Sequence, residues 1–533
     1  MRTRMRLSAV EWILLGISVL AIVLMGRQVV VQGITYDSAF DMEAYNTIST
    51  AEFPPSLEQA YEIAPITSEF YGLLTFQVTE FVGGPFGVTI DPNRLDSYQL
   101  HHGFIAVLSV LGAVAIGSAM GLALRSRLSG LFATAIILVT PLWMGLGTMD
   151  YKDVPIAAGL SLISMALTIS FTRAGPAWMA TAITAGVAGT VVAFGTRAGS
   201  VALVIALMGI AFIVQVARAL VVRESNSLIR AIVVIAASLS GGFVWLYLSN
   251  PFARLGIVRW LRDAVDISQS YIWIGLVRTA GQDLPSNELP WWYVPAWLSA
   301  QLPLMTSVLC LVGIVLLLVG LRYPRSSDVT PNRGTWIDLT AILSQGVVLP
   351  IVVIGSGAVL YDGIRHLLFA LPAFVALSAV LVAKASTASR KTSRKVNTWT
   401  VAVSIAMVGV VLSLFAVVRW FPYTYSFINP IAGWDKSERN WELDYWGVTS
   451  REGVARLREQ GLDPIVVIPA PETGRPFNVI GPEEGDAYTA ATGQARGVYV
   501  FRRWDAVFRQ DWCTRTFTIE RDGLILGEGG TCP

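Results

Sequence analysis

The chain is poor in charge, in cysteine and in histidine. Only 14% of its 533 residues are charged, and cysteine and histidine occur three times each. It contains no Cys-x-x-Cys, no His-Glu-x-x-His and no spacing typical of zinc ligands, so no structural metal site is indicated. The formal net charge is +2, and no basic patch is interleaved with aromatic residues. These features argue against nucleic-acid binding.

Apolar residues make up 54% of the chain. They form about eleven runs, each near the roughly 20 residues that cross a bilayer core as a helix. The sequence therefore predicts an all-α polytopic membrane protein of about eleven transmembrane helices. The predicted spans are 9–31, 101–124, 128–147, 154–172, 177–195, 199–217, 231–248, 297–321, 337–360, 366–383 and 399–418.

An odd number of spans places the two termini on opposite sides of the membrane. With the N-terminus in the cytoplasm, the opposing short loops keep only Lys152, Arg197 and Arg365 as basic residues. This distribution follows the positive-inside rule and predicts an extracytoplasmic C-terminus. Only five of the 39 basic residues are lysine, a bias typical of GC-rich bacterial genomes, which favours a bacterial plasma membrane. The first run is long and lacks a clear cleavage site, so we interpret it as a retained span.

Three outer segments are long enough to fold, namely 32–97, 249–296 and 419–533. We predict a transmembrane catalytic domain over residues 1–418, with the first two segments as its outer loops. The third segment contains strand-like runs at 465–468, 497–501 and 517–519 and a helical run at 450–459. This alternation predicts a small extracytoplasmic α/β domain over 419–533.

The two outer loops have distinct compositions. Mixed apolar and polar positions at near-helical spacing predict a helix over 66–78 that lies along the membrane surface. The second loop is rich in tryptophan, which is typical of an aromatic belt at headgroup level, with a substrate-binding role as the alternative. Its tryptophans are Trp260, Trp273, Trp291, Trp292 and Trp297.

The three cysteines fall in two environments. Cys310 lies within a predicted span and is interpreted as a small buried apolar residue. Cys513 and Cys532 lie in the outer domain, where an oxidising compartment permits a disulfide between them. The sequence leaves this pairing open.

Polar residues collect at one end of the predicted bundle. Asp37, Asp41 and Glu43 follow the first span, and the remaining groups lie at the same outer membrane face. They are His101, His102, Asp150, Lys152, Asp153, Arg197, Asp362, Arg365 and His366. Ionisable residues at such depth are usually functional. The sequence thus predicts a mixed-charge site at the outer leaflet, covered by the segments 32–97 and 249–296.

Two chemistries fit a site of this kind. In an enzyme, an aspartate acts as general base on a hydroxyl while Lys and Arg neutralise a departing phosphate. In a transporter, ionisable groups carry protons or ions, but near the bilayer midplane and often within inverted repeats. Here the groups lie at one rim and the hydropathy pattern shows no repeat, which favours the enzyme. A non-catalytic envelope scaffold is the remaining alternative.

Three stretches resemble the GT-C type polytopic glycosyltransferases, specifically the bacterial branch of the protein-mannosyltransferase-like family 39. Residues 34–38 are similar to its first-loop Asp-Glu element, although Ser38 stands where the family usually has Glu. Residues 140–143 and 149–155 are similar to its segment ending in Pro-Lys-Asp-x-Pro, although Tyr151 replaces the Pro. The closing pattern of the family is similar to 365–372, 421–430 and 444–447.

The resemblance implies inverting transfer of a hexosyl or pentosyl group from an outer-leaflet polyprenyl-phosphate donor. The acceptor would be a hydroxyl of a cell-envelope glycan, lipid or protein. Asp37 would be the catalytic base, with Asp41 or Glu43 as a second carboxylate. Residues assigned to substrate binding are Lys152, Asp153, Arg365, His366 and His102. Whether a divalent cation takes part is left open.

Each assignment has a structural alternative. Asp37 is also a suitable N-cap for a helix over 39–50. Lys152 and Asp153 also suit a local interfacial ion pair, and Arg365 suits a structural partner for Asp362. Because Asp37 and Asp41 are four residues apart, a helix there would place both carboxylates on one face, where their proximity raises the pKa of one of them.

Overall fold

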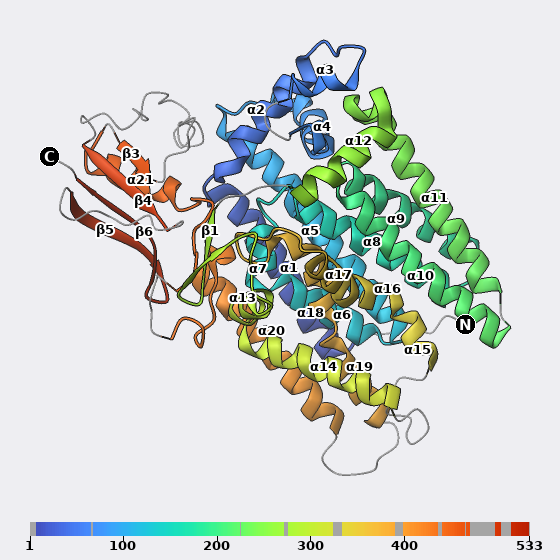
Figure 1. Ribbon diagram of the computed structural model, residues 1–533. Helices are drawn as coiled ribbons and strands as arrows, with labels where there is room; N and C mark the ends of the chain where they lie inside the picture. Colours follow the sequence, from blue (N-terminus) through green and yellow to red (C-terminus); the bar gives the residue numbers. More distant parts are fainter. Residues whose placement is uncertain are drawn as a thin grey trace.

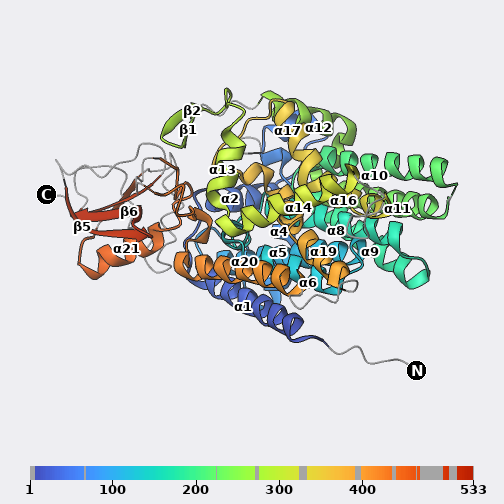
Figure 2. The same ribbon diagram turned by 90° about the horizontal axis from the view of Figure 1, so that it is seen from below.

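The protein is described by a computed structural model, in which most of the chain is helical and a β-sheet lies at one end (Figure 1). The C-terminal sheet and the turn between α10 and α11 lie at opposite ends of the molecule in two perpendicular views (Figures 1 and 2). The described residues are 7–64, 68–223, 225–270, 275–322, 333–389, 398–434, 440–463, 465–468, 496–502 and 513–531.

All eleven predicted runs are helical. Within the described ranges, eight helical segments are long and apolar enough to cross a membrane, and three are shorter. The predicted polytopic helical class is therefore confirmed, whereas the number of crossings stays a prediction. The longer segments are α1 (Ala9–Val31), α5 (Leu95–Ala123), α8 (Val154–Thr172), α9 (Pro176–Phe194), α10 (Ser200–Val222), α11 (Asn226–Ser249), Arg365–Lys384 and α20 (Thr398–Trp420). The shorter ones are α6 (Arg127–Leu138), the segment Leu304–Gly320 of α14 (Leu304–Arg322) and the segment Thr340–Gly355.

Helix α20 illustrates why these segments belong in lipid. Its exposed positions recur every three or four residues, which defines one helix face. In a protein surrounded by water such a face would carry polar residues, but here it is mostly apolar, with Ser404 as the exposed polar residue in its middle. The exposed large apolar side chains are Val401, Ile405, Val408, Val411, Leu412, Phe415 and Val418.

The predicted spans 128–147 and 297–321 each divide into two helices, and two further spans divide into three or more helical pieces. The run at 337–360 divides into α15 (Arg333–Asp338), α16 (Thr340–Leu343), a π-helical turn η3 (Ser344–Val348) and α17 (Leu349–Gly355). Within the π turn, the buried amide of Gln345 accepts a hydrogen bond from Ser164 (2.8 Å) and donates one to the Phe369 carbonyl (2.8 Å). A π turn re-aims a side chain that a continuous α-helix would direct elsewhere.

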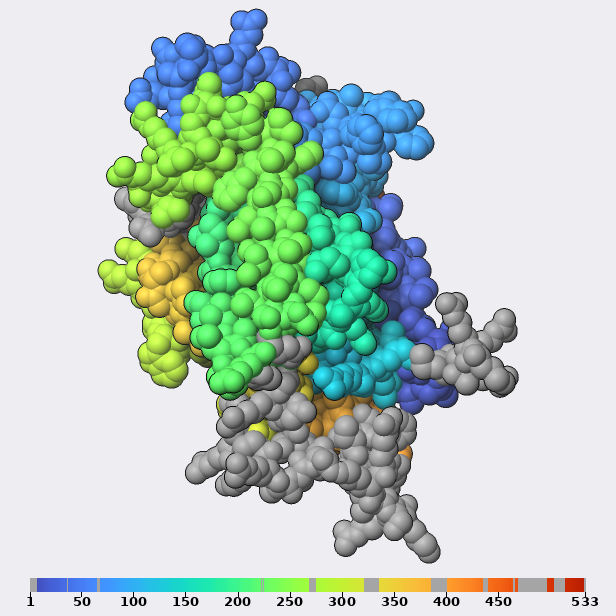
Figure 3. All heavy atoms as spheres, turned by 90° about the vertical axis from the view of Figure 1, so that its right-hand side faces the viewer, coloured from blue at the N-terminus to red at the C-terminus, as the bar shows by residue number. Residues whose placement is uncertain are grey.

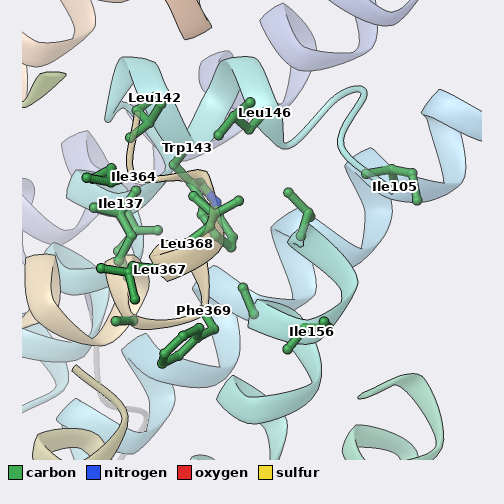
Figure 4. Close-up of a cluster of buried hydrophobic side chains, with 14 of the residues drawn as sticks. Ile105, Ile137, Leu142, Trp143, Leu146, Ile156, Ile364, Leu367, Leu368 and Phe369 are labelled. Atoms are coloured by element: carbon green, nitrogen blue, oxygen red, sulfur yellow. The ribbon is translucent and has the colours of Figure 1, made fainter. Parts of the chain in front are cut away.

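The run at 366–383 also divides into helical pieces. It consists of η4 (Arg365–Ala370), α18 (Leu371–Ala376) and α19 (Ala379–Ser389). Figure 4 shows Leu367 and Leu368 of η4 beside Ile137 and Leu142 in a buried apolar cluster. This packing fixes the backbone immediately after Arg365, at the outer face of the bundle.

The two outer loops pack against each other (Figure 3). The first loop contains α2 (Tyr36–Thr50), α3 (Leu57–Tyr61), η1 (Ser68–Phe70), α4 (Leu74–Gly83) and η2 (Gly84–Phe86). The second loop contains α12 (Pro251–Ser270), α13 (Tyr293–Gln301) and, between them, a hairpin of β1 (Leu276–Thr279) and β2 (Gln282–Pro285). Tyr61 donates a hydrogen bond to Asp263 (3.0 Å), and Trp260 Nε1 donates one to the Glu69 carbonyl (2.9 Å).

The aromatic-belt interpretation is wrong for two of the tryptophans in the second loop. Trp260 and Trp297 are fully buried, and Trp297 Nε1 donates a hydrogen bond to the Thr279 hydroxyl (2.9 Å). Trp291 is 84% exposed, as an interfacial residue would be, while Trp273 lies outside the described residues. Buried indole rings with satisfied N–H groups hold the loops together.

The predicted continuous helix over 66–78 is also wrong. The chain is not helical at Tyr71 and Gly72 because it forms backbone hydrogen bonds to the turn between α9 and α10. Gly72 N–H donates to the Thr196 carbonyl (2.8 Å), and Leu74 N–H donates to the Gly195 carbonyl (3.0 Å). A Cβ at Gly72 would lie 1.9 Å from the Gly195 oxygen, so only glycine permits this approach.

The close approach at Gly72 leads to a stability prediction. Gly72→Ala should lower the free energy of unfolding by about 1–3 kcal/mol, because a methyl group cannot be accommodated against rigid backbone. Gly209→Ala in α10 is the matched control, since a Cβ there meets nothing within 4 Å. Thermal unfolding in detergent measures both, and equal melting temperatures for the two variants would contradict the close contact.

The C-terminal region forms a four-stranded sheet of order β3-β4-β6-β5 with one helix against it. Its elements are α21 (Ser450–Glu459), β3 (Ile465–Ile468), β4 (Gly497–Phe501), β5 (Thr514–Arg521) and β6 (Leu524–Thr531). The predicted helix and three strands are confirmed, but β6 was not predicted. Its glycines lower strand propensity, yet they make room for aromatic rings: a Cβ at Gly527 would meet Tyr499, and one at Gly529 would meet Phe517.

This sheet region is fixed to the helical bundle. Arg451 of α21 donates hydrogen bonds to the carbonyls of Val30 and Gln32 at the end of α1 (both 2.8 Å). Trp420 at the end of α20 donates one to Asp522 in the β5–β6 turn (2.8 Å). Cys513 is disulfide-bonded, and its predicted partner, Cys532, lies outside the described residues.

Candidate active site

Two carboxylates of α2 share one lysine. Lys152 Nζ lies 3.3 Å from Asp37 Oδ2 and 2.8 Å from Asp41 Oδ2, so the predicted single helix face is confirmed. The helix begins at Tyr36, and its N-cap is Thr35, whose hydroxyl accepts the Ser38 N–H. The alternative interpretation of Asp37 as the helix cap is therefore wrong. The Asp37 carboxylate instead contacts Lys152.

Lys152 lies in a turn between α7 (Pro141–Leu146) and α8. Asp150 shapes this turn, because its Oδ1 accepts the backbone N–H groups of Lys152 (3.1 Å) and Asp153 (2.9 Å). The lysine side chain reaches across to α2 and also lies 4.9 Å from the centre of the Tyr71 ring. Lys152 therefore pairs with the carboxylates of α2, and the predicted local ion pair with Asp153 is wrong.

Asp153 instead lies between two arginines. Arg197 NH1 is 3.9 Å and Arg365 NH1 is 4.0 Å from its carboxylate oxygens. Arg365 NH2 also lies 3.1 Å from Asp362 Oδ2, which confirms the pairing that the sequence left as an alternative. Asp362 has a left-handed φ of 55°, a conformation that non-glycine residues adopt at a cost.

The C-terminal region contributes an aromatic surface to this cluster. The Arg365 guanidinium lies 4.8 Å from the Tyr361 ring centre and 5.1 Å from that of Trp446. Arg365 is 4% exposed, so it is held between two rings and an acidic partner. The next residue, His366, packs edge-on against Tyr361 with ring centres 4.5 Å apart. A guanidinium held in this way is preorganised for an anion.

Mutual proximity perturbs the ionisation of the carboxylates and the lysine. Burial raises the pKa of Asp41 to about 6, with the nearby Lys152 opposing and the Asp37 carboxylate reinforcing the rise. Burial alone would lower the pKa of the Lys152 ammonium, but Asp37 and Asp41 outweigh it and hold that pKa well above its ordinary value. Lys152 is thus a permanent cation, whereas Asp41 titrates close to neutrality.

This raised pKa predicts an acid limb in the activity profile. Above pH 6 Asp41 is ionised and forms an ion pair with Lys152. Below pH 6 Asp41 is protonated and the ion pair is lost. Activity should therefore fall as the pH decreases through about 6. In Asp41→Asn the remaining activity should lose this limb. An unchanged limb in that variant would assign the titration to another group.

A cavity of about 480 Å³ adjoins the Asp153–Arg197 pair. Arg197, His366 and Asp153 form its polar end, and the remaining wall is mostly apolar. The apolar lining includes Ile156, Leu203, Val265, Val353, Val359, Leu360 and Phe369. A long apolar wall with a cationic end suits an amphiphile that carries an anionic headgroup.

The predicted site residues separate into those that cluster and one that does not. Asp37, Asp41 and Lys152 form one group. Asp153, Arg365 and His366 form the adjoining group. His102 lies apart, with its Nδ1 3.4 Å from the Gln32 amide, while His101 packs against Tyr151 with ring centres 5.3 Å apart. The role of His102 in substrate binding stays a prediction.

The sequence placed Arg197 in the mixed-charge group without giving it a binding role, and it gave no role to Tyr71 or Trp446. Arg197 was recognised as an outer-face cation, but nothing in the sequence indicated that a backbone bridge joins it to Tyr71. Its guanidinium also lies 5.4 Å from the Tyr71 ring centre. Trp446 lies in a segment similar to the closing pattern of the family, which was the available signal.

The acidic pair does not fit a divalent cation. Lys152 Nζ already lies at hydrogen-bonding distance from both carboxylates, in the place that a shared metal ion would take. Among the described residues, no group of three or more His, Cys, Asp or Glu side chains is arranged to hold a metal.

Comparison with known proteins gives structural similarity only. No family model matches the chain, and no curated protein matches it. Among solved structures, it is similar to ArnT from Cupriavidus metallidurans bound to undecaprenyl phosphate, with a TM-score of 0.47 and 13% identity over 98% of both chains. The apo state of ArnT gives a TM-score of 0.48, again with 13% identity and 98% of both chains covered. We therefore base the functional assignment on the geometry of the site itself.

Proposed function

We propose that this protein is a GT-C type membrane glycosyltransferase that uses a polyprenyl-phosphate sugar as donor. The observation that carries the proposal is the Tyr71 ring, which lies 4.9 Å from Lys152 of the carboxylate cluster and 5.4 Å from Arg197, a residue that lines the large cavity. Such an arrangement places a lipid-linked phosphate beside a carboxylate base. Neither half of the site performs group transfer without the other.

The polar end of the cavity is suited to the leaving phosphate. Arg197 and His366 line the cavity, and Arg365 lies 4.0 Å from Asp153 at the same end. Negative charge grows on the phosphate oxygen as the glycosidic bond breaks, and fixed cations stabilise it most when they are already in place. The apolar wall receives the first isoprenoid units, while the rest of the chain lies in lipid.

The carboxylates are suited to activating the acceptor. The Asp37 side chain is 28% exposed and that of Asp41 is 7% exposed, so Asp37 is the more accessible base. An acceptor hydroxyl oxygen attacks the anomeric carbon and passes its proton to Asp37. The bond between that carbon and the phosphate oxygen breaks, and its electron pair leaves with polyprenyl phosphate. Attack opposite the leaving group inverts the anomeric configuration.

The reaction takes place at the outer leaflet. The basic residues of the short loops support an N-terminus in the cytoplasm and a site on the opposite side of the membrane. The donor is then a hexosyl or pentosyl polyprenyl phosphate of the outer leaflet. The acceptor hydroxyl belongs to an envelope glycan, lipid or protein.

Blocking the cavity tests this proposal. Leu203→Trp places an indole in the cavity and should lower transfer from radiolabelled polyprenyl-phosphate sugars in membranes at least 10-fold. Ile213→Trp is the matched control on the same helix, because Ile213 is 66% exposed on the lipid-facing surface. Equal transfer by both variants would exclude the cavity as the donor site. Absence of transfer from every donor, with the unmodified protein, would contradict the proposed activity.

A further inference from the structure

A second and smaller cavity lies against α2. Its volume is about 20 Å³, which accommodates little more than one water-sized group. Asp41, Tyr45, Ser68, Tyr151 and Lys152 contribute to its wall. Lys152 therefore connects this cavity to Asp37, since its ammonium contacts both carboxylates of α2.

Two hydroxyl groups of this small cavity have no hydrogen-bond partner within the described parts of the chain. They are Ser68 Oγ and Tyr151 Oη, on residues that are 4% and 7% exposed. Buried hydroxyls nearly always find a partner, because leaving one unpaired costs free energy. A ligand that supplies both a donor and an acceptor would satisfy them, as an alcohol does.

The remaining wall selects against charged ligand groups. Asp41 repels an anion, and Lys152 repels a cation, so a neutral group is favoured. The rings of Tyr45, Phe76 and Tyr151 form the apolar part of the wall. Aromatic faces beside hydroxyl-binding groups are suited to the alternating C–H and O–H surface of a sugar.

We propose that this cavity binds a second hydroxyl of the acceptor while the attacked hydroxyl lies at Asp37. The inference rests on the proposed function and specifies its acceptor class. Asp37 and Asp41 lie 3.3 and 2.8 Å from the same ammonium, and Asp41 and Lys152 line the small cavity, so the position at Asp37 and the cavity adjoin one lysine. The acceptor is therefore a polyhydroxylated carbohydrate, and not an isolated serine or threonine hydroxyl of a protein.

Removal of the two cavity hydroxyls tests this inference. Tyr151→Phe and Ser68→Ala keep the shape of the wall and should each raise the KM for a glycoside acceptor about 10-fold, a loss typical of one hydrogen bond. Release of polyprenyl phosphate to water should stay unchanged, because donor binding does not use these hydroxyls. Tyr98→Phe is the matched control, since the buried Tyr98 hydroxyl donates to the Pro92 carbonyl outside this cavity.

The assay uses the full-length protein in detergent with a labelled polyprenyl-phosphate sugar, a panel of methyl glycosides and a Ser/Thr-containing peptide. We expect label on a glycoside and not on the peptide, with both cavity variants impaired and Tyr98→Phe active. Donor cleavage with label on the peptide, or with unimpaired cavity variants, would overturn the carbohydrate inference alone. No cleavage of any donor would overturn the proposed function and the inference with it. The cavity variants should melt no lower than the parent without acceptor, which separates a binding defect from misfolding.

Discussion

Replacing Asp37 by asparagine is expected to reduce sugar transfer about 10²- to 10⁴-fold, which is the usual contribution of a positioned general base. The amide keeps the shape of the side chain but cannot accept the proton of the acceptor hydroxyl. Donor binding should persist, because the proposed phosphate-binding end of the cavity is formed by Arg197 and His366. The loss should therefore appear in kcat and not in the KM for the donor.

Stability should change little in this variant. Lys152 keeps Asp41 as its partner at 2.8 Å, and the Asp37 side chain is partly solvated, so the lost pair contributes about 1 kcal/mol or less. Glu43→Gln is a suitable control, because it also removes a carboxylate from α2 but at a position two residues from Asp41. If Asp37→Asn retained transfer within about 3-fold of the parent, Asp37 would not be the base and Asp41 would take its place.

Replacing Arg365 by leucine is expected to lower the free energy of unfolding by about 3–5 kcal/mol, the usual cost of breaking a buried ion pair. Arg365 is 4% exposed and Asp362 is 1% exposed, with 3.1 Å between their charged atoms. Without the guanidinium, the carboxylate of Asp362 stays buried but loses its ion pair with Arg365. Arg94→Gln is the control, because the Arg94–Asp96 pair is exposed and should contribute about 1 kcal/mol or less.

A double variant separates the lost charge pair from lost packing. Asp362→Asn combined with Arg365→Leu removes the buried carboxylate charge, and asparagine tolerates the left-handed φ of 55° at this position. The double variant should therefore melt above Arg365→Leu alone, while transfer stays abolished in both. If the second substitution lowered stability further, the defect would come from the lost contacts with Tyr361 and Trp446. Chemical or thermal unfolding in detergent measures all four proteins.

The helical bundle could be predicted because its signal is local. A run of apolar residues long enough to cross a bilayer is visible in any window of the sequence, and all eleven runs are helical. The spacing of Asp37 and Asp41 is likewise local, so their common helix face was predictable. The helix at 450–459 was predicted with its observed bounds for the same reason.

The errors occurred where distant segments decide the local structure. The segment 66–78 has helical spacing, but Gly72 and Leu74 form hydrogen bonds with the turn at 195–196. Backbone pairing across such a distance overrides local propensity. Strand β6 was missed because its glycines indicate a loop, whereas in the sheet they make space for Tyr499 and Phe517.

The site was predicted as a set of residues but not as an arrangement. Placing the polar groups at one membrane face identified Lys152 and Arg365, yet the sequence assigned both to the leaving phosphate. The structure pairs Lys152 with α2 and places Arg197 at the end of the cavity. Lys152 and Asp37 are 115 positions apart, and no periodic pattern in the sequence encodes which cation meets which carboxylate across such a distance.

Cleavage of a labelled polyprenyl-phosphate sugar in proteoliposomes is the most direct test of the central claim. A glycosyltransferase releases polyprenyl phosphate and moves the label to an acceptor, and Asp37→Asn should abolish both products while keeping the parent's melting temperature. A transporter would move the intact lipid or another solute without breaking the bond. Translocation of intact donor, with no polyprenyl phosphate formed by the parent protein, would contradict the account.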